Sequence, residues 1–355
     1  MTQKRRPINR FIAIALLLHI PLFFYPVLRL ADWLDWSALL TGTILLPVAF
    51  SQIIARRVLY QRQGHWVFIL RNMADFVLGA AFIMLIILLV FELLRPLFNL
   101  SSETAGRGVL TSTAVVLLLG MRHAFSPIIR PVTLRSRKVS RRHRFVQISD
   151  VHIGSRSTRF LNQVVKRIEQ LQPDFLCITG DFIDQPGITR SQLSALSRLD
   201  CPIYYCTGNH ERYEDFDAIM ERLSSLDVEV LRNRKTVHNE LQILGIDDQD
   251  DALQVQKVLP TLPVDTEHYS ILLYHRPTGL EACAEHGVDL MLSGHTHGGQ
   301  IMPFNLLVRR VFSRTRGLYQ HEGTTLYVSE GTGTWGPFLR LGTRSEITLF
   351  TLDPE

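Results

Sequence analysis

Long runs of apolar residues with almost no charge fill the first third of the chain, residues 11–121, and they restrict its fold more than any other feature. About 20 apolar residues suffice to cross a bilayer as a helix, which satisfies its backbone hydrogen bonds within its own segment. The run from Phe82 to Phe91 has no polar side chain before Glu92. We therefore expect membrane-spanning helices here, followed by a part of the chain with a soluble-domain pattern.

Four segments are predicted to span the membrane. They are Phe11–Leu30, Trp36–Ala55, Ala74–Leu94 and Gly108–Met121. The last is short and lies between Arg107 and Arg122, so crossing requires both arginines to reach the interface or the bilayer to thin locally. Ionisable residues at the span edges, such as Asp75 and Glu92, are expected to pair between helices or lie at the interface.

Basic residues precede the first predicted span, lie between the second and third, and follow the fourth, whereas the opposite loops contain few. The positive-inside rule then predicts a cytoplasmic position for everything after the spans. The net charge of +5 reflects this clustering around apolar segments. Because no recognition motif accompanies it, we expect contact with lipid headgroups and no nucleic-acid binding. The predicted organisation is a membrane domain (1–130), a basic linker (131–143) and a second domain (144–355).

Five short groups of potential metal ligands occur in the second domain, each just after an apolar, β-rich run. They are Asp150-Val151-His152, Gly180-Asp181, Gly208-Asn209-His210, His275 and Gly294-His295-Thr296-His297. Strands alternate with helices here, which indicates an α/β architecture with active loops at strand ends. Such loops meet at one sheet edge, so the groups are expected to converge. Asp150 and His152 would point the same way if the chain is extended there.

The chemistry of these groups suits divalent cations of the Mn, Fe, Zn or Mg class, because it combines carboxylate and amide oxygens with imidazole nitrogens. The four cysteines lie outside the groups and show no CxxC spacing. They are expected to be reduced thiols. A single Asp-x-His or Gly-Asp pair is common by chance, whereas residues 294–300 form a more specific pattern. Together the groups predict a two-metal hydrolytic site.

In these groups the chain resembles the calcineurin-like metallophosphoesterase superfamily, and its membrane segments make it similar to the membrane-associated bacterial branch. The resemblance covers about residues 143–352 and implies a double β-sandwich flanked by helices. It implies that Asp150, His152 and His297 bind one metal ion, that Asn209, His275 and His295 bind a second, and that Asp181 bridges them. It makes His210 the proton donor.

Two further acidic residues lie near these motifs, Asp184 and Glu211. Glu211 follows Gly208-Asn209-His210 where Asp is frequent in the family. This departure puts in doubt a contact with the ligand residues, and not a contact with the metal. Asp184 matches the acid that orients the catalytic histidine in some members, so we predict it as a second catalytic residue. A helix or turn cap is the alternative for Asp184.

The resulting prediction is an integral protein of a bacterial inner membrane with a cytoplasmic, metal-dependent phosphoric ester hydrolase domain. A metal-bridging hydroxide is expected to attack a phosphodiester or pyrophosphate while His210 protonates the leaving oxygen. The membrane anchor alone suggests a lipid or nucleotide-linked lipid substrate. A broad phosphomonoesterase and a catalytically idle metal-binding membrane sensor are the alternatives, and the oligomeric state is left open.

One further segment, Pro303 to Tyr319, mixes apolar residues with arginines directly after the last histidines. It is interpreted as a basic, apolar flap at the membrane surface. The alternative is a partly buried helix or loop that packs on the domain.

Overall fold

The computed structural model describes residues 18–59, 62 and 64–355. The chain divides into two compact units, residues 1–121 with 336–338, and residues 122–335 with 339–355. The start of the first predicted span, residues 11–17, lies outside the described residues, as do the basic residues that precede it.

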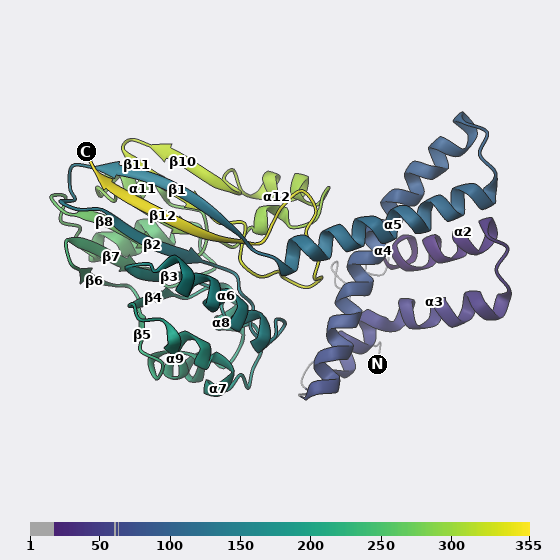
Figure 1. Ribbon diagram of the computed structural model, residues 1–355, viewed down its shortest axis with the longest axis horizontal. Helices are drawn as coiled ribbons and strands as arrows, with labels where there is room; N and C mark the ends of the chain where they lie inside the picture. Colours follow the sequence, from purple (N-terminus) through teal and green to yellow (C-terminus); the bar gives the residue numbers. More distant parts are fainter. Residues whose placement is uncertain (1–17, 60–61, 63) are drawn as a thin grey trace, which may run out of the picture. The chain divides into compact units, whose positions relative to one another are not determined.

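The first unit is helical (Figure 1). Its elements are η1 (Ile20–Phe24), α2 (Tyr25–Trp33), α3 (Ala38–Ile53), η2 (Ile54–Val58), α4 (His65–Leu97) and α5 (Ser102–Phe125), the last of which continues into the second unit. Among the described residues, three helices are long and apolar enough to cross a membrane. These are Ala38–Val58, His65–Leu97 and Ser102–Phe125. Four spanning helices remain a prediction.

The last of these helices is longer than the sequence pattern suggested. The predicted span of 108–121 is part of a helix of 24 residues, about 36 Å long at 1.5 Å per residue. The helix begins earlier because Ser101 caps it, its hydroxyl accepting a hydrogen bond from the Thr104 N–H at 3.1 Å. A helix of this length covers a hydrocarbon core of about 30 Å without local thinning.

Ion pairs between helices neutralise charges in the apolar segments. Arg56 pairs with the buried Asp75 of α4 at 2.8 Å, and the Nε of Arg29 in α2 lies 2.5 Å from the Glu92 carboxylate of α4. Both acids therefore pair between helices, as their positions in the sequence indicated.

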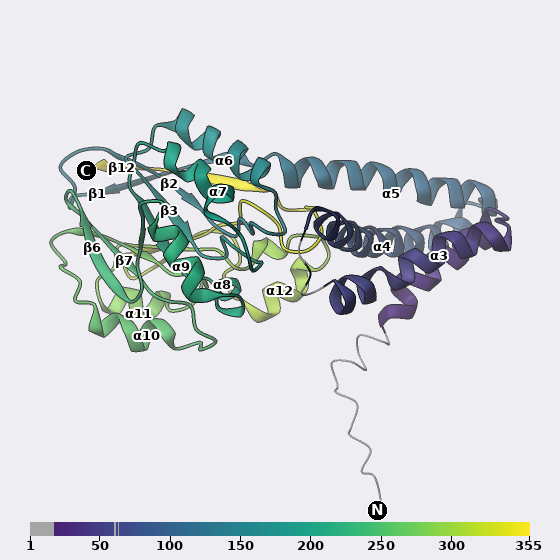
Figure 2. The same cartoon turned by 90° about the horizontal axis from the view of Figure 1, so that it is seen from below.

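The second unit is built from two six-stranded sheets (Figures 1 and 2). The first has the order β1-β12-β2-β3-β4-β5 and the second the order β10-β11-β9-β8-β7-β6. The strands are β1 (Ile128–Ser136), β2 (His143–Ile148), β3 (Phe175–Thr179), β4 (Ile203–Cys206), β5 (Val228–Val230), β6 (Arg234–His238), β7 (Leu241–Gly245), β8 (Tyr269–Leu273), β9 (Leu290–Ser293), β10 (Gly317–His321), β11 (Thr324–Val328) and β12 (Glu346–Pro354).

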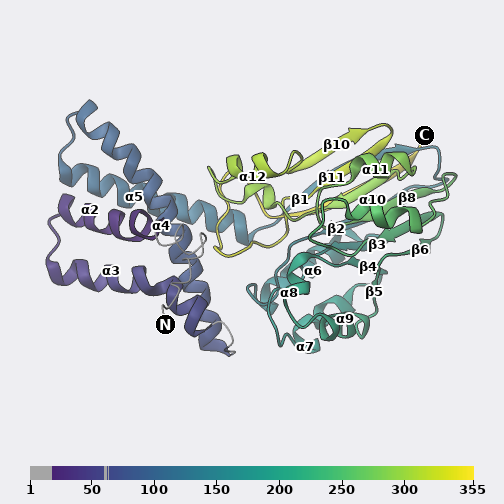
Figure 3. The same ribbon diagram turned by 180° about the vertical axis from the view of Figure 1, so that it is seen from behind.

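The second unit also contains α-helices, several of which cover the outer faces of the two sheets. They are α6 (Thr158–Leu171), α7 (Arg190–Leu193), α8 (Asn209–Tyr213), α9 (Phe216–Ser224), α10 (Gln254–Val258), α11 (Leu280–Glu285) and α12 (Asn305–Val311). α6 and α9 lie against the first sheet, and α10 and α11 lie against the second (Figure 3). Their apolar side chains pack on the sheets. This is the double β-sandwich flanked by helices that the family resemblance implied.

Between the sheets lies a core rich in aromatic rings. Phe145 stacks between Phe175 and Phe350, with 4.8 Å between ring centroids on each side. Buried residues of β7, β8 and β9 complete the same core from the second sheet. This packing holds the two sheets face to face, so that the ends of β2, β3, β4, β8 and β9 can form one site.

The predicted basic linker, residues 131–143, coincides with most of β1 and the turn after it. β1 pairs in parallel with β12 over its full length, from Ile128 opposite Glu346 to Ser136 opposite Pro354. This part of the chain therefore contributes a strand to the first sheet.

Candidate metal centre

Every predicted ligand lies within a few residues of the end of a strand. Most lie in loops, whereas Asn209 is the first residue of α8 and His297 begins a short 3-10 helix (His297–Gly299). Asp150 follows β2, Asp181 follows β3 and Asn209 follows β4 in the first sheet, whereas His275 follows β8 and His295 follows β9 in the second. Both sheets thus deliver polar side chains at the carboxyl ends of parallel strands, the usual place for a site in such folds. The five groups converge as the sequence predicted.

The backbone at five of the seven predicted ligands is left-handed rather than extended. Residues with positive φ include Asp150 (53°), His152 (57°), Asp181 (49°), His295 (72°) and His297 (50°). The expectation of an extended chain at Asp150 and His152 is therefore wrong. Non-glycine residues rarely adopt this conformation, and such strain concentrates at functional sites where surrounding contacts enforce it.

Hydrogen bonds between the loops enforce this backbone. The N–H of Asp150 donates to the Gly180 carbonyl at 3.1 Å, and the N–H of His152 donates to the Asp181 carbonyl at 3.0 Å. Gly208 lies so close to Asp181 that a Cβ atom at this glycine would overlap the carboxylate. The glycine beside the ligand therefore permits the close approach that the sequence suggested.

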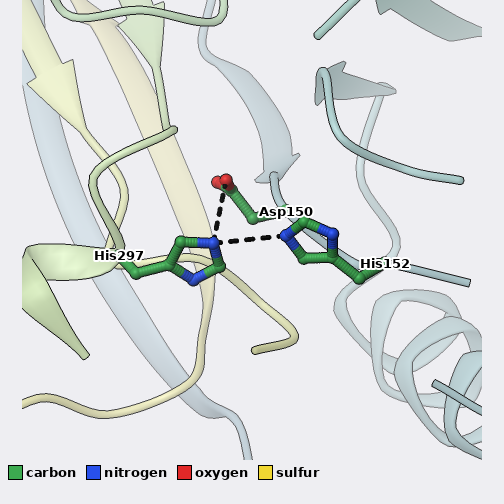
Figure 4. Close-up of side chains that lie close together, drawn as sticks. All are labelled: Asp150, His152 and His297. Carbon is green, nitrogen blue, oxygen red and sulfur yellow. Dashed lines mark hydrogen bonds and ion pairs between the residues drawn. The ribbon is translucent and has the colours of Figure 1, made fainter. Parts of the chain in front are cut away.

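The first cluster consists of Asp150, His152 and His297 (Figure 4). The Nε2 atom of His297 lies 3.3 Å from Asp150 Oδ1 and 3.2 Å from His152 Nε2. All three residues are buried, and their ligand atoms lie within 4.8 Å of one another. This is the set expected to bind one metal ion.

The second cluster consists of Asp181, His275 and His295. His275 Nε2 lies 3.1 Å from both Asp181 Oδ2 and His295 Nδ1. The Thr179 carbonyl contacts the other ring nitrogen of His275 at 2.8 Å and so fixes the orientation of the ring. The carboxamide oxygen of Asn209 is buried without a hydrogen-bond partner. A buried acceptor of this kind costs free energy unless a ligand satisfies it.

The electrostatics of both clusters favour cation binding. Burial lowers the pKa of His295 to about 3, and burial together with His152 holds the pKa of His297 well below its usual value. Their imidazoles are therefore neutral and offer lone pairs. Burial opposes the charged form of His275, but Asp181 outweighs it and raises the pKa of His275 to about 10. A proton on His275 thus balances the negative charge of the Asp181 carboxylate. A divalent cation would balance the same charge, and the oxygen and nitrogen ligands of the cluster suit such an ion.

The two predicted catalytic residues lie beside the clusters. His210 Nε2 is 4.0 Å from Asp181 Oδ2, and the His210 side chain keeps 22% of its surface exposed, against 0% for His152. The His210 side chain is therefore more accessible than that of His152. Asp184 lies closer to a different histidine than expected, with Oδ2 3.4 Å from His152 Nδ1 and Oδ1 accepting from the Ser155 N–H. This contact turns Nε2 of His152 toward the first cluster.

Glu211 has a larger role than its sequence suggested. Its buried carboxylate accepts hydrogen bonds from the backbone N–H groups of Asp181 (3.1 Å), Phe182 (2.6 Å), Ile183 (3.0 Å) and Gly208 (2.9 Å). Burial and the nearby Asp181 raise the pKa of Glu211 to about 7. Glu211 therefore fixes two ligand loops to each other. A glutamate three residues after Gly208 is the capping-box position, which was the available sequence signal.

Arg340 lies in the core beside the first cluster. It is fully buried, and its Nη2 donates to the carbonyls of Glu330 (2.5 Å) and Gly333 (2.8 Å). The same nitrogen lies 3.3 Å from His297 Nδ1. Arg340 therefore positions His297 and the glycine-rich loop of residues 331–336. Its local sequence gives no signal for this role.

Comparison with known proteins agrees with this geometry. A model of the calcineurin-like phosphoesterase family matches residues 143–299. A Helicobacter pylori protein described as an uncharacterized metallophosphoesterase is 35% identical over 241 residues, covering 64% of this chain and 65% of its own. A Bos taurus transmembrane protein with metallophosphoesterase domain is 31% identical over 327 residues, covering 78% of this chain and 72% of its own. The chain belongs to the calcineurin-like metallophosphoesterase family.

The extent of these matches is uneven. The chain spans slightly less than two thirds of the Helicobacter and Campylobacter relatives, between 63% and 65%. Among solved structures, the phosphopantetheinyl hydrolase of Mycobacterium tuberculosis is 14% identical with a TM-score of 0.36, covering 57% of this chain and 96% of its own. That likeness is too low to support an argument about function. The predicted superfamily is confirmed, and the apolar helices together with the transmembrane relative indicate membrane association.

Proposed function

We propose that this protein is a membrane-anchored phosphoesterase that uses two divalent cations to hydrolyse a phosphodiester or pyrophosphate bond. The observation that carries the proposal is the pair of buried clusters, Asp150 with His152 and His297, and Asp181 with His275 and His295. Two adjacent N and O donor sets suit a two-metal phosphoesterase. Cations of the Mn, Fe, Zn or Mg class fit these ligands.

The ligand roles follow the clusters. Asp150, His152 and His297 would hold one cation, and Asn209, His275 and His295 the other, with the Asp181 carboxylate shared between them. When bound, the cations supply Lewis acidity toward the phosphoryl oxygens and the attacking water.

His210 is the proposed proton donor to the departing oxygen. Asp181 accepts a hydrogen bond from the His210 backbone N–H at 2.9 Å, which fixes the start of α8 beside the site. Burial outweighs the nearby carboxylates and lowers the pKa of His210, so the ring is mostly neutral near pH 7 and its protonated form is a stronger acid. General-acid catalysis of this kind contributes about 10²–10⁴-fold to rate. Asp184 supports the site through its contact with His152.

The membrane helices support a substrate that resides in the bilayer, such as a lipid or nucleotide-linked lipid phosphoester. Basic residues after α3, including Arg56, Arg57 and Arg62, support a cytoplasmic position for the catalytic unit, in a bacterial inner membrane. Membrane lipids and the phosphoester are the proposed partners.

The test is hydrolysis by the purified full-length protein in detergent with manganese. A soluble aryl phosphodiester, an aryl phosphomonoester and a polyprenyl pyrophosphate are compared, each with and without chelator. We expect chelator-sensitive hydrolysis of the diester or the pyrophosphate. Turnover of the monoester alone would support the broad phosphomonoesterase, and metal binding without any turnover would support the idle sensor.

A His210→Ala variant tests the proton donor. It should retain both metal ions yet lose about 10²–10⁴-fold in turnover of esters with poor leaving groups. His268→Ala, at an exposed histidine, is the matched control and should hydrolyse at the wild-type rate. Wild-type turnover by His210→Ala would remove this residue from the acid role.

A further inference from the structure

The segment Met302–Arg316, which we term the surface segment, exposes apolar side chains beside the candidate metal centre. Its helix α12 contains no buried residue. The exposed apolar residues of the segment are Met302 (54%), Phe304 (49%), Leu306 (58%), Leu307 (59%) and Val311 (74%). A contiguous group of this kind marks an interaction site more often than ordinary surface.

The helical spacing gathers part of this group on one face. Phe304, Leu307 and Val311 are three and four residues apart, so they share one side of α12. Arg309 and Arg310 are exposed on the same helix. An exposed apolar face beside basic residues is the composition of segments that lie in a membrane interface.

Two further arginines fix the end of the surface segment to the domain. Arg314 pairs with Glu281 at 2.6 Å, and Arg316 pairs with Glu330 at 3.1 Å. Arg309 and Arg310 therefore remain as the positive charges carried by α12 itself, and they complement anionic lipid headgroups.

The surface segment is joined to the end of a helix that is long and apolar enough to span a membrane. Ser345 donates from its N–H to the His123 carbonyl (3.2 Å) and from its hydroxyl to the Ala124 carbonyl (3.0 Å), both in the last turn of α5. Four residues earlier, the Leu341 carbonyl accepts a hydrogen bond from the Met302 N–H at 3.0 Å. One short stretch thus contacts both elements, and α12 lies at the end of the second unit where β1 begins (Figures 1 and 2).

The surface segment also touches the candidate metal centre. The ring of Phe312 packs edge to face on the His295 imidazole, with 5.2 Å between centroids. A change in the position of α12 would therefore affect His295, a predicted metal ligand.

We propose that the surface segment lies in the headgroup region of an anionic bilayer, with Phe304, Leu307 and Val311 in the apolar layer and Arg309 and Arg310 on lipid phosphates. The metal centre then opens beside the membrane surface. This inference goes beyond the proposed function, because it concerns lipid contact and does not depend on turnover.

The test places a fluorophore on α12 of the full-length protein in vesicles that contain phosphatidylglycerol. In a Cys201→Ser background, Leu307→Cys is labelled with an environment-sensitive dye, and lipids carrying an acyl-chain nitroxide are added as quenchers. The other three cysteines are buried. Val237→Cys in β6 is the matched control, because Val237 is 64% exposed. Strand β6 lies at the end of the second unit opposite α12 (Figures 1 and 2).

We expect strong quenching at position 307 and little at 237. Reversing both charges, with Arg309→Glu and Arg310→Glu, should abolish most of the quenching at 307 while hydrolysis of a soluble diester in detergent stays unchanged. Equal quenching at 307 and 237 would overturn the proposal. A blue-shifted but unquenched label at 307 would also overturn it, since a protein surface, from a second copy or the same chain, would then cover α12.

Discussion

Replacement of Arg340 by methionine should destabilise the second unit strongly. Methionine fills similar space but donates no hydrogen bond. The variant would lose the donations to Glu330 and Gly333 at 2.5 and 2.8 Å. Charge-assisted bonds contribute about 1.5–3 kcal/mol each, and a buried carbonyl left without a donor costs about 1–3 kcal/mol. Part of this loss is offset because no buried charge remains to be desolvated.

The net cost is therefore about 4 kcal/mol. For a domain of this size that corresponds to a melting temperature lower by about 8–16 °C. Burial lowers the pKa of Arg340 to about 10, so the guanidinium is charged at neutral pH and the bonds are charge-assisted. Arg340→Lys keeps the charge but loses the planar fork, so its melting temperature should lie between those of wild type and Arg340→Met.

The assay is thermal unfolding of the full-length protein in detergent, together with manganese content per chain by elemental analysis. Because Arg340 lies 3.3 Å from His297, metal retention at the first cluster should fall in parallel. Arg309→Met, at an exposed arginine, is the control and should change stability by less than about 0.5 kcal/mol. A melting temperature of Arg340→Met equal to that of the control would refute the assignment of Arg340 as a positioning residue.

Three further changes test other parts of the structure. Asp181→Asn should lower bound manganese at both positions at once, and unchanged metal content by elemental analysis would contradict the bridging role. Phe145→Ala removes the ring stacked between two others and should destabilise the second unit by about 3–5 kcal/mol in denaturant unfolding, whereas a loss under 1 kcal/mol would mean that the core rearranges. The hydrogen bond from His143 lowers the pKa of Glu240 to about 2. The stabilisation that this hydrogen bond gives is therefore complete above the usual glutamate pKa of 4.5 and is lost as the pH falls toward 2. Unfolding between pH 5 and 2 should therefore be steeper for wild type than for Glu240→Gln, and identical profiles would dismiss this effect.

The sequence by itself determined the features that depend on local composition. Hydropathy locates helices long enough to cross a bilayer, because the thickness of the hydrocarbon layer sets the length of an apolar run. Alternation of strands and helices, with a ligand group after each strand, predicts one polar edge, because parallel strands end together. The residue types at that edge predict the metal chemistry, since the ligand preference of a cation is a property of the donor atoms.

Only the tertiary structure decided which distant groups meet. β1 pairs with β12 across more than two hundred residues, and the short alternation from Val132 to Arg135 does not reveal which strand is its partner. The left-handed backbone at Asp150 and His152 arises from hydrogen bonds to a neighbouring loop, so a rule based on strand geometry gave the wrong conformation there.

Tertiary structure also decided which residues contact the predicted ligands. Asp184 contacts His152, and Arg340 reaches His297, because the packing of two sheets brings their loops together. Such contacts depend on how the whole domain packs. A side chain that binds backbone groups distant in sequence is therefore not marked by the residues next to it in the chain. The sequence thus determined the chemistry available to the site, and the packing of the two sheets determined which atoms hold it in place.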